Sequence, residues 1–134
     1  MPELWRPSET RVADANLTRF IRCVNARRGL RLRDYTDLYA WSLSSAPAFW
    51  TELARFADIR ADWGAGPPIE NPAAMPGALF FSDTRLNFAE NLLRYDDEEP
   101  ALVFRNERGS RRSLSYGELR AEVARVSARV GSEN

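Results

Sequence analysis

Apolar residues recur at helical spacing through the first half of the chain. Within residues 16–28 they fall at positions i, i+3, i+4 and i+7, which places them on one face of an α-helix and predicts a helix that Gly29 ends. Two further helices are predicted, over residues 35–44, capped by Asp34, and over residues 47–57, where proline suits the first turn. The apolar faces of the first and third helices are Leu17, Phe20, Ile21 and Val24, and Phe49, Trp50, Leu53 and Phe56.

This periodicity is lost between residues 60 and 78. Two stretches rich in proline and glycine, residues 63–68 and residues 71–77, exclude regular helix and central strand. So long a loop is unusual inside a compact domain. We therefore expect it to run as a tether over the surface of something larger, followed by a short helix near residues 87–94.

The last third of the chain predicts a β-hairpin followed by a helix. Residues 101–105 and 111–114 form two predicted strands, joined by a turn at residues 106–109. Ser115 and Glu118 stand at the spacing of a capping box, which starts a helix that continues almost to the end of the chain. Because a hairpin with one helix is marginal by itself, the pattern predicts a piece of a longer protein.

Composition narrows the chemistry of the chain. It has 134 residues, and its 19 basic side chains, balanced by 19 acidic ones, are all arginine. Because it has no lysine, it lacks the ammonium group that a phosphate loop or a Schiff base requires. Because it has no histidine, it lacks the usual general base at neutral pH and the commonest metal ligand. The one cysteine, Cys23, excludes an internal disulfide and a cysteine-cluster zinc site. We therefore predict no catalytic, cofactor-binding or metal-binding residue, and expect no enzymatic activity from this chain alone.

Charge and hydropathy also bear on partners and location. The balance of acidic and basic residues argues against a general binder of nucleic acid or anionic membranes. No apolar run approaches the length of a membrane span, and the N-terminal residues lack the hydrophobic core of a signal peptide. A cytoplasmic protein is expected.

Three segments stand out in order along the chain: Asp34, Tyr35, Leu38, Trp41, Ser42, Phe49 and Trp50, then Leu86–Arg94, then Ala101–Phe104 with Leu114–Leu119 and Val123. Together they resemble the N-terminal region of acyl-CoA synthetases of the acetyl-CoA and acetoacetyl-CoA synthetase type. The second segment favours the acetoacetyl-CoA branch, because acetyl- and propionyl-CoA synthetases tend to carry a different run there. The likeness extends from Leu4 to Val130.

The resemblance implies an α+β fragment with a structural task. Residues 1–59 would be a helical N-terminal cap, residues 60–99 an irregular tether, and residues 100–134 the truncated beginning of the large AMP-binding domain. The complete enzyme would use ATP, magnesium and coenzyme A to convert acetoacetate to acetoacetyl-CoA, AMP and diphosphate. The partner of this chain would be the remainder of the ligase. The family's phosphate loop and its lysines do not occur in the sequence, so no catalytic residue can be carried over.

Two alternative functions remain open at this point. The chain could be a stand-alone helical protein-interaction module whose aromatic face binds a partner, or a nucleic-acid binder driven by arginine. The second alternative predicts binding that weakens with salt.

Charged side chains suggest two sites, each with a structural interpretation that we favour. Six arginines between residues 19 and 33 could contact a phosphate-rich ligand such as coenzyme A, or an acidic partner, but suit a solvated helix face. Asp96–Glu99 could bind a hard cation, but lacks the alternating spacing of a calcium loop and suits a solvated loop. The six are Arg19, Arg22, Arg27, Arg28, Arg31 and Arg33.

Polar and aromatic residues suggest further sites. Asn87, Glu90 and Asn91 could line a site, but are favoured as residues that fix their loop against the large domain. Cys23 is expected to be a buried structural thiol and not a reactive one. The tryptophans could stack on nucleic-acid bases, but packing in a core or interface is favoured for Trp41, Trp50 and Trp63, and Trp5 is expected to pin the N-terminus.

Overall fold

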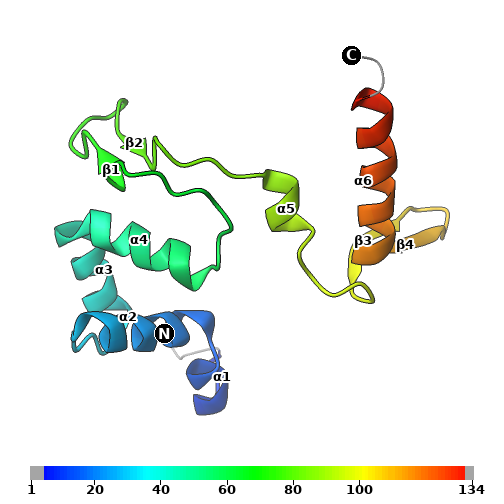
Figure 1. Cartoon of the computed structure of the whole chain (residues 1–134). Helices are drawn as coiled ribbons and strands as arrows, with labels where there is room; N and C mark the ends of the chain where they lie inside the picture. The colour runs from blue at the N-terminus through cyan, green and yellow to red at the C-terminus, as the bar shows by residue number, and fades with distance from the viewer. Residues whose placement is uncertain (1–4, 132–134) are drawn as a thin grey trace. The chain divides into compact units, whose positions relative to one another are not determined.

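The structure is a computed structural model that describes residues 5–131. The chain divides into two compact units, Met1–Arg85 and Leu86–Asn134 (Figure 1). Leu4, where the family resemblance begins, and the last three residues lie outside the described part. Six helices and two antiparallel strand pairs among the described residues confirm the α+β class. The division into cap, tether and large domain stays a prediction.

Local sequence explains where the helices of the first unit begin and end. Ser8 accepts a hydrogen bond from a backbone N–H of the first helix at 3.2 Å, and Asp34 accepts one from the third helix at 3.0 Å, which satisfies N–H groups that lack helical partners. Gly29 ends the second helix with φ of 66°, a left-handed conformation that glycine adopts readily. The four helices are α1 (Glu9–Ala13), α2 (Asn16–Arg28), α3 (Tyr35–Ser44) and α4 (Ala46–Phe56).

The core of this unit lies where α2, α3 and α4 meet. The ring centroid of Phe20 lies 5.9 Å from that of Phe49 and 5.2 Å from that of Phe56, distances typical of edge-to-face and tilted aromatic packing. Leu17, on the predicted apolar face of α2, is 44% exposed, so burial along that face begins one turn later. The buried core residues are Phe20, Ile21, Val24 and Leu38.

The segment that the sequence predicts to be irregular contains a pair of very short strands. Strand β1 (Ile69–Glu70) pairs with β2 (Leu79–Phe80) in antiparallel register. The backbones of Asp62 and Arg85 exchange two hydrogen bonds, of 2.8 and 2.9 Å, so the segment is closed at its base. Ile69 is 8% exposed. These residues therefore fold as part of the first unit.

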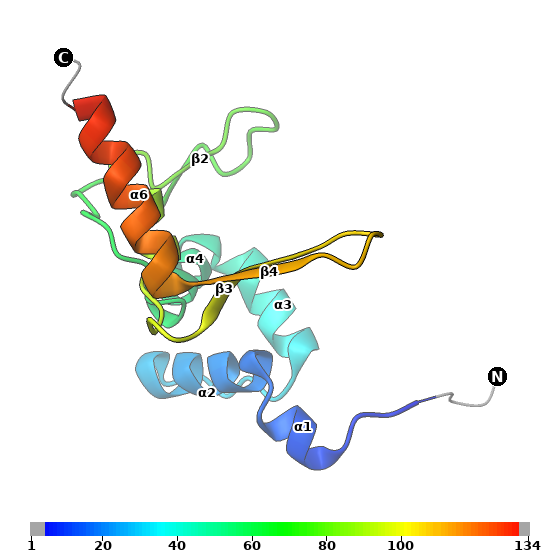
Figure 2. The same cartoon turned by 90° about the vertical axis from the view of Figure 1, so that its right-hand side faces the viewer.

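The second unit consists of a short helix, a hairpin and a longer helix. Helix α5 (Phe88–Leu92) precedes β3 (Pro100–Arg105) and β4 (Arg111–Ser115), which form an antiparallel pair, and α6 (Tyr116–Gly131) follows directly (Figures 1 and 2). The predicted capping box is confirmed, since Ser115 N–H donates to the Glu118 carboxylate at 2.9 Å and Glu118 N–H donates to the Ser115 hydroxyl at 3.3 Å.

Candidate functional site

The arginines of α2 and the loop after it divide into paired and exposed members. Arg28 donates from Nε to the Glu52 carboxylate at 2.9 Å, and Arg33 donates to Asp37 through Nε and Nη2 at 2.7 and 3.0 Å. Arg19, Arg22, Arg27 and Arg31 are all exposed. The structure therefore supports a largely solvated face and gives three of the six residues side-chain partners, because Arg19 also donates from Nη1 to Asn16 Oδ1 at 3.5 Å. It brings no phosphate-binding loop to this surface within the described residues.

The Arg33–Asp37 pair shifts the titration of both groups. The side-chain hydrogen bond from Arg33, assisted by the backbone N–H of the same residue, lowers the pKa of Asp37 to about 2. The same hydrogen bond and the charge of Asp37 raise the pKa of Arg33. Asp37 lies in the first turn of α3 and Arg33 just before it, so this pair connects the start of the helix to the segment that precedes it.

Glu52 is a charged residue in the core that the sequence analysis did not identify. Its side chain is 3% exposed, and one carboxylate oxygen accepts from Arg28 at 2.9 Å and from Arg55 at 3.2 Å. A buried carboxylate requires such partners. The signal was present in the sequence, because position 52 lies three residues after Phe49 and four before Phe56, on the face that packs against α2.

Two predictions about single residues are wrong. Cys23 is exposed, although it was expected to be buried, because it lies at the edge of the apolar stripe of α2, on the side away from Ile21. Trp5, which was expected to pin the N-terminus, is 67% exposed. The guanidinium of Arg11 lies 5.7 Å from the centroid of its ring, so the contact that it makes is a surface cation–π pair.

The other tryptophans pack against aromatic neighbours, although Trp50 and Trp63 each remain 38% exposed. Trp41 lies against Phe49 at 6.1 Å between ring centroids, and Trp50 lies against Phe80 at 5.3 Å. The ring centroid of Trp63 lies 5.4 Å from that of Phe81. The contacts of Trp50 and Trp63 hold the segment that contains β1 and β2.

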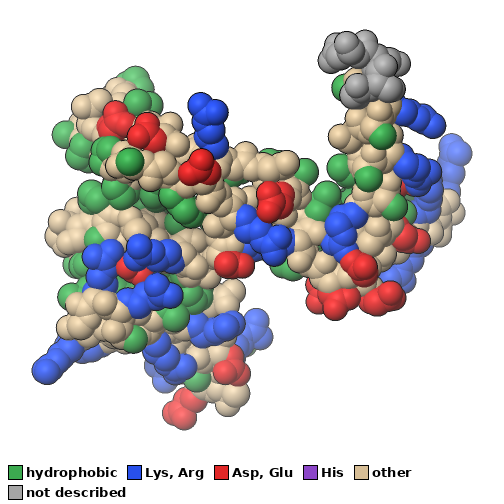
Figure 3. Space-filling model, in the orientation of Figure 1, with side chains coloured by type: hydrophobic (Ala, Val, Ile, Leu, Met, Phe, Trp, Pro, Cys, Tyr) green, Lys and Arg blue, Asp and Glu red, His purple; other side chains and the backbone are tan. Residues whose placement is uncertain are grey.

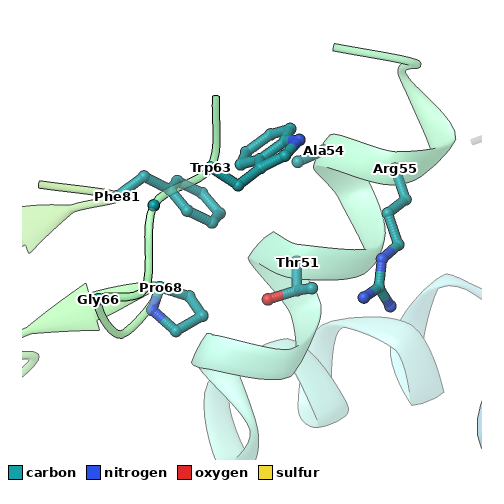
Figure 4. Close-up of a pocket in the computed structure, with 8 residues that line it drawn as sticks. Thr51, Ala54, Arg55, Trp63, Gly66, Pro68 and Phe81 are labelled. Atoms are coloured by element: carbon teal, nitrogen blue, oxygen red, sulfur yellow. The ribbon is translucent and has the colours of Figure 1, made fainter. Parts of the chain in front are cut away.

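A pocket of about 280 Å³ remains between this segment and α4. Figure 4 shows Trp63, Phe81 and Pro68 on one side of it, and Thr51, Ala54 and Arg55 of α4 on the other. The sequence analysis missed this pocket, because its two walls are separated by loop residues whose path local patterns do not fix.

Polar residues before and within the second unit mostly make local bonds. Asn87 caps α5, accepting from the N–H of Glu90 at 3.1 Å, and its backbone carbonyl accepts from the Asn91 amide at 3.0 Å. In the acidic loop, Asp97 forms an ion pair with Arg120. Among the residues that the structure describes, no group of three or more possible metal ligands comes together.

Apolar side chains of the second unit lie open on its surface. The hairpin and α6 present hydrophobic residues that are 40% to 63% exposed, and Figure 3 shows hydrophobic side chains along α6. In the described part of this unit, no side chain is buried to the level of the first unit's core. The exposed apolar residues of the hairpin and α6 are Leu102, Val103, Phe104, Val123, Val126 and Val130. We call this set the apolar surface of the second unit.

Comparison with known proteins places the chain beside acyl-CoA synthetases. No protein-family model matches the sequence. The solved structure of acetoacetyl-CoA synthetase from Streptomyces lividans matches with a TM-score of 0.86 and 30% identity, over 98% of this chain and 21% of that one.

Sequence relatives give the same result. Acetoacetyl-coenzyme A synthetase of Rhizobium meliloti is 36% identical over 92% of the chain, acetoacetyl-CoA synthetase of Danio rerio is 31% identical over 93%, and malonamoyl-CoA synthetase of Penicillium aethiopicum is 34% identical over 91%. The chain spans about a fifth of the length of these relatives, 18% to 19%. The resemblance to the N-terminal region of acetoacetyl-CoA synthetases is confirmed. No helix in the described range is long and apolar enough to cross a membrane.

Proposed function

We propose that this chain is the N-terminal part of an ATP-dependent acyl-CoA ligase that converts acetoacetate to acetoacetyl-CoA. The observation that carries the proposal is the similarity to acetoacetyl-CoA synthetases along almost the whole chain, at a TM-score of 0.86. Within such an enzyme these residues would supply structure. The first unit would form a cap, and the hairpin with α6 would begin the large domain and pack against the remainder of that domain.

The exposed apolar side chains of the second unit support this structural role. A solvent-exposed apolar area of this extent marks a surface that another part of a protein covers. Fully burying a valine or phenylalanine side chain contributes about 1.5–3 kcal/mol. These side chains are 40% to 63% exposed and Val103 faces away from Leu102 and Phe104, so each one that is covered would contribute part of that amount before ordering costs.

ATP, magnesium and coenzyme A are assigned to the rest of the enzyme in this proposal. The described residues bring together no metal-binding cluster, and the sequence holds no lysine for a phosphate loop. The exposed arginines of α2 are one charged surface on which a phosphate group could lie. A cytoplasmic location follows from the proposed activity.

A chimeric enzyme tests the proposal. This chain would replace the matching region of the Rhizobium meliloti acetoacetyl-CoA synthetase, and formation of acetoacetyl-CoA and AMP would be measured. We expect activity within about ten-fold of the parent, a difference of about 1.4 kcal/mol, and none from the chain alone.

Matched variants make the test specific for docking. Val126→Asp places a charge on the apolar surface of the second unit and should abolish activity or assembly, whereas Arg108→Asp, in the hairpin turn, should have little effect. A soluble, folded chimera without activity would contradict the proposal, as would equal effects of the two variants.

One observation favours a second function, a stand-alone interaction module. The first unit has its own core, and α3 carries an exposed stacked pair, Tyr35 and Tyr39, with ring centroids 6.0 Å apart. A module predicts that the isolated chain is monomeric and unfolds cooperatively, and that the chimera is inactive.

A further inference from the structure

The pocket between α4 and the β1–β2 segment has the form of a small-ligand site. Its walls are largely apolar, with the rings of Trp63 and Phe81 at 67° to one another facing Thr51 and Ala54 (Figure 4). An apolar cavity of about 150 Å³ accommodates benzene. The volume of this pocket, about 280 Å³, therefore accommodates one aromatic ring with a short substituent. Ligand sites commonly combine such walls with a few polar groups.

Unusual backbone conformations form one wall of the pocket. Phe81 has φ of 49°, a left-handed conformation that costs energy for a bulky residue. Gly64 has φ of 62°, and a Cβ atom there would lie 2.8 Å from the carbonyl oxygen of Asp83. The wall is thus held by residues that admit few replacements, and the ring of Phe81 is directed against Trp63.

Charge is distributed unevenly across the pocket. Arg55 lies on the α4 side and uses one of its five N–H donors on Glu52, at 3.2 Å. Glu52 also binds Arg28, so Arg55 shares its carboxylate partner with a second guanidinium and is not fully neutralised by it. Asp83 lies behind Gly66, which Figure 4 places on the opposite side of the pocket from Arg55. A negative group of a ligand is therefore favoured at the Arg55 end.

We propose that this pocket binds a small organic anion, with a flat apolar body between the aromatic wall and α4 and a carboxylate at Arg55. Thr51, whose hydroxyl donates to the Pro47 carbonyl at 2.8 Å, retains its oxygen as an acceptor at the pocket. The ligand class follows from these walls and charges, and it does not depend on the ligase proposal.

Nuclear magnetic resonance of the ¹⁵N-labelled chain tests this site. The four tryptophans give four indole N–H signals, and Trp63→Phe identifies the one at the pocket. Titration with phenylacetate should shift the Trp63 signal and leave that of the exposed Trp5 unchanged. The uncharged analogue phenylacetamide should bind about ten-fold more weakly, because it lacks the charge that strengthens a hydrogen bond to arginine.

Variants separate the roles of charge and shape. Arg55→Met should weaken phenylacetate binding about ten-fold or more, Arg55→Lys should recover part of it, and Thr51→Phe should abolish it by filling the pocket. Arg27→Met, on the exposed face of α2, is the matched control and should leave binding unchanged. An unshifted Trp63 signal at millimolar phenylacetate would overturn the proposal, as would equal binding of the acid and the amide or equal effects of the two methionine variants.

Discussion

The buried carboxylate of Glu52 gives the sharpest prediction about stability. It joins α2 to α4 through Arg28, at 2.9 Å, and is joined to its own helix through Arg55, at 3.2 Å. The perturbation is a set of three variants, Arg28→Met, Arg55→Met and the double replacement. Methionine keeps much of the arginine stem that covers apolar surface, so the variants remove mainly charge and hydrogen bonding.

The magnitudes follow from exposure. The two arginine side chains are 38% and 55% exposed, so solvent screens each ion pair. Since a hydrogen bond to a charged group contributes about 1.5–3 kcal/mol, we expect losses of about 1–2 kcal/mol for Arg28→Met and about 0.5–1 kcal/mol for Arg55→Met. In the double variant the carboxylate, only 3% exposed, has neither cation. Removing the partner of a buried charge costs about 3–5 kcal/mol, which exceeds the sum of the single losses.

Urea unfolding followed by circular dichroism measures these free energies. Arg27→Met is the matched control, because this residue is the helical neighbour of Arg28 and is exposed. It should change the unfolding free energy by less than about 0.5 kcal/mol. The reasoning is refuted if the double variant loses only the sum of the single losses, within about 0.5 kcal/mol, or if Arg28→Met and Arg27→Met are equal.

Three further predictions concern backbone, titration and capping. Gly64→Ala should cost at least about 1 kcal/mol in urea unfolding, since the position has positive φ and faces a backbone carbonyl; an unchanged midpoint would contradict this. Because the Arg33 hydrogen bond lowers the pKa of Asp37 to about 2, below its unfolded value, the stabilisation is full above about pH 4 and is lost as pH falls through 2. Asp37→Asn should therefore lower the thermal midpoint at pH 6 but not near pH 2, and a difference that persists in acid would contradict the assignment. Ser115→Ala should reduce the stability of α6 by about 1 kcal/mol, which circular dichroism should detect as a loss of helical signal. Ser127→Ala, within the helix, should not reduce that signal.

Helices and their ends could be predicted because the signals are local. The bounds of α2 and α3 agree with prediction, and the predicted caps Asp34 and Ser115 make the expected bonds. Each of these features depends on residues within four positions along the chain, where side-chain chemistry and helical period act directly.

Features that depend on distant residues could not be predicted from local patterns. The pairing of β1 with β2 joins residues nine and eleven positions apart across a proline-rich loop, and the pocket brings α4 against Trp63 and Phe81. The burial of Cys23 is predicted wrongly because this residue borders the apolar stripe of α2. The neighbouring helices determine which edge of that stripe is buried. The burial of the Glu52 carboxylate depends on Arg28, which comes from another helix and forms an ion pair with it.

The two units differ in what holds them together, and hydrogen exchange tests the difference. The first unit buries Phe20, Ile21, Val24 and Leu38 in one cluster, whereas the described part of the second unit buries no comparable side chain. A two-stranded hairpin is marginal in water, and an isolated 16-residue helix is too. Backbone amides of α2 should therefore exchange slowly in the isolated chain, and those of α6 should exchange rapidly.

In the chimeric ligase the amides of α6 should become protected, because the apolar surface of the second unit would then be covered. Fast exchange of α6 in both contexts would contradict docking, and slow exchange in the isolated chain would show that the hairpin and helix stabilise one another without a partner. The amides of α2 serve as the internal control, since their protection comes from a core that the chain itself supplies.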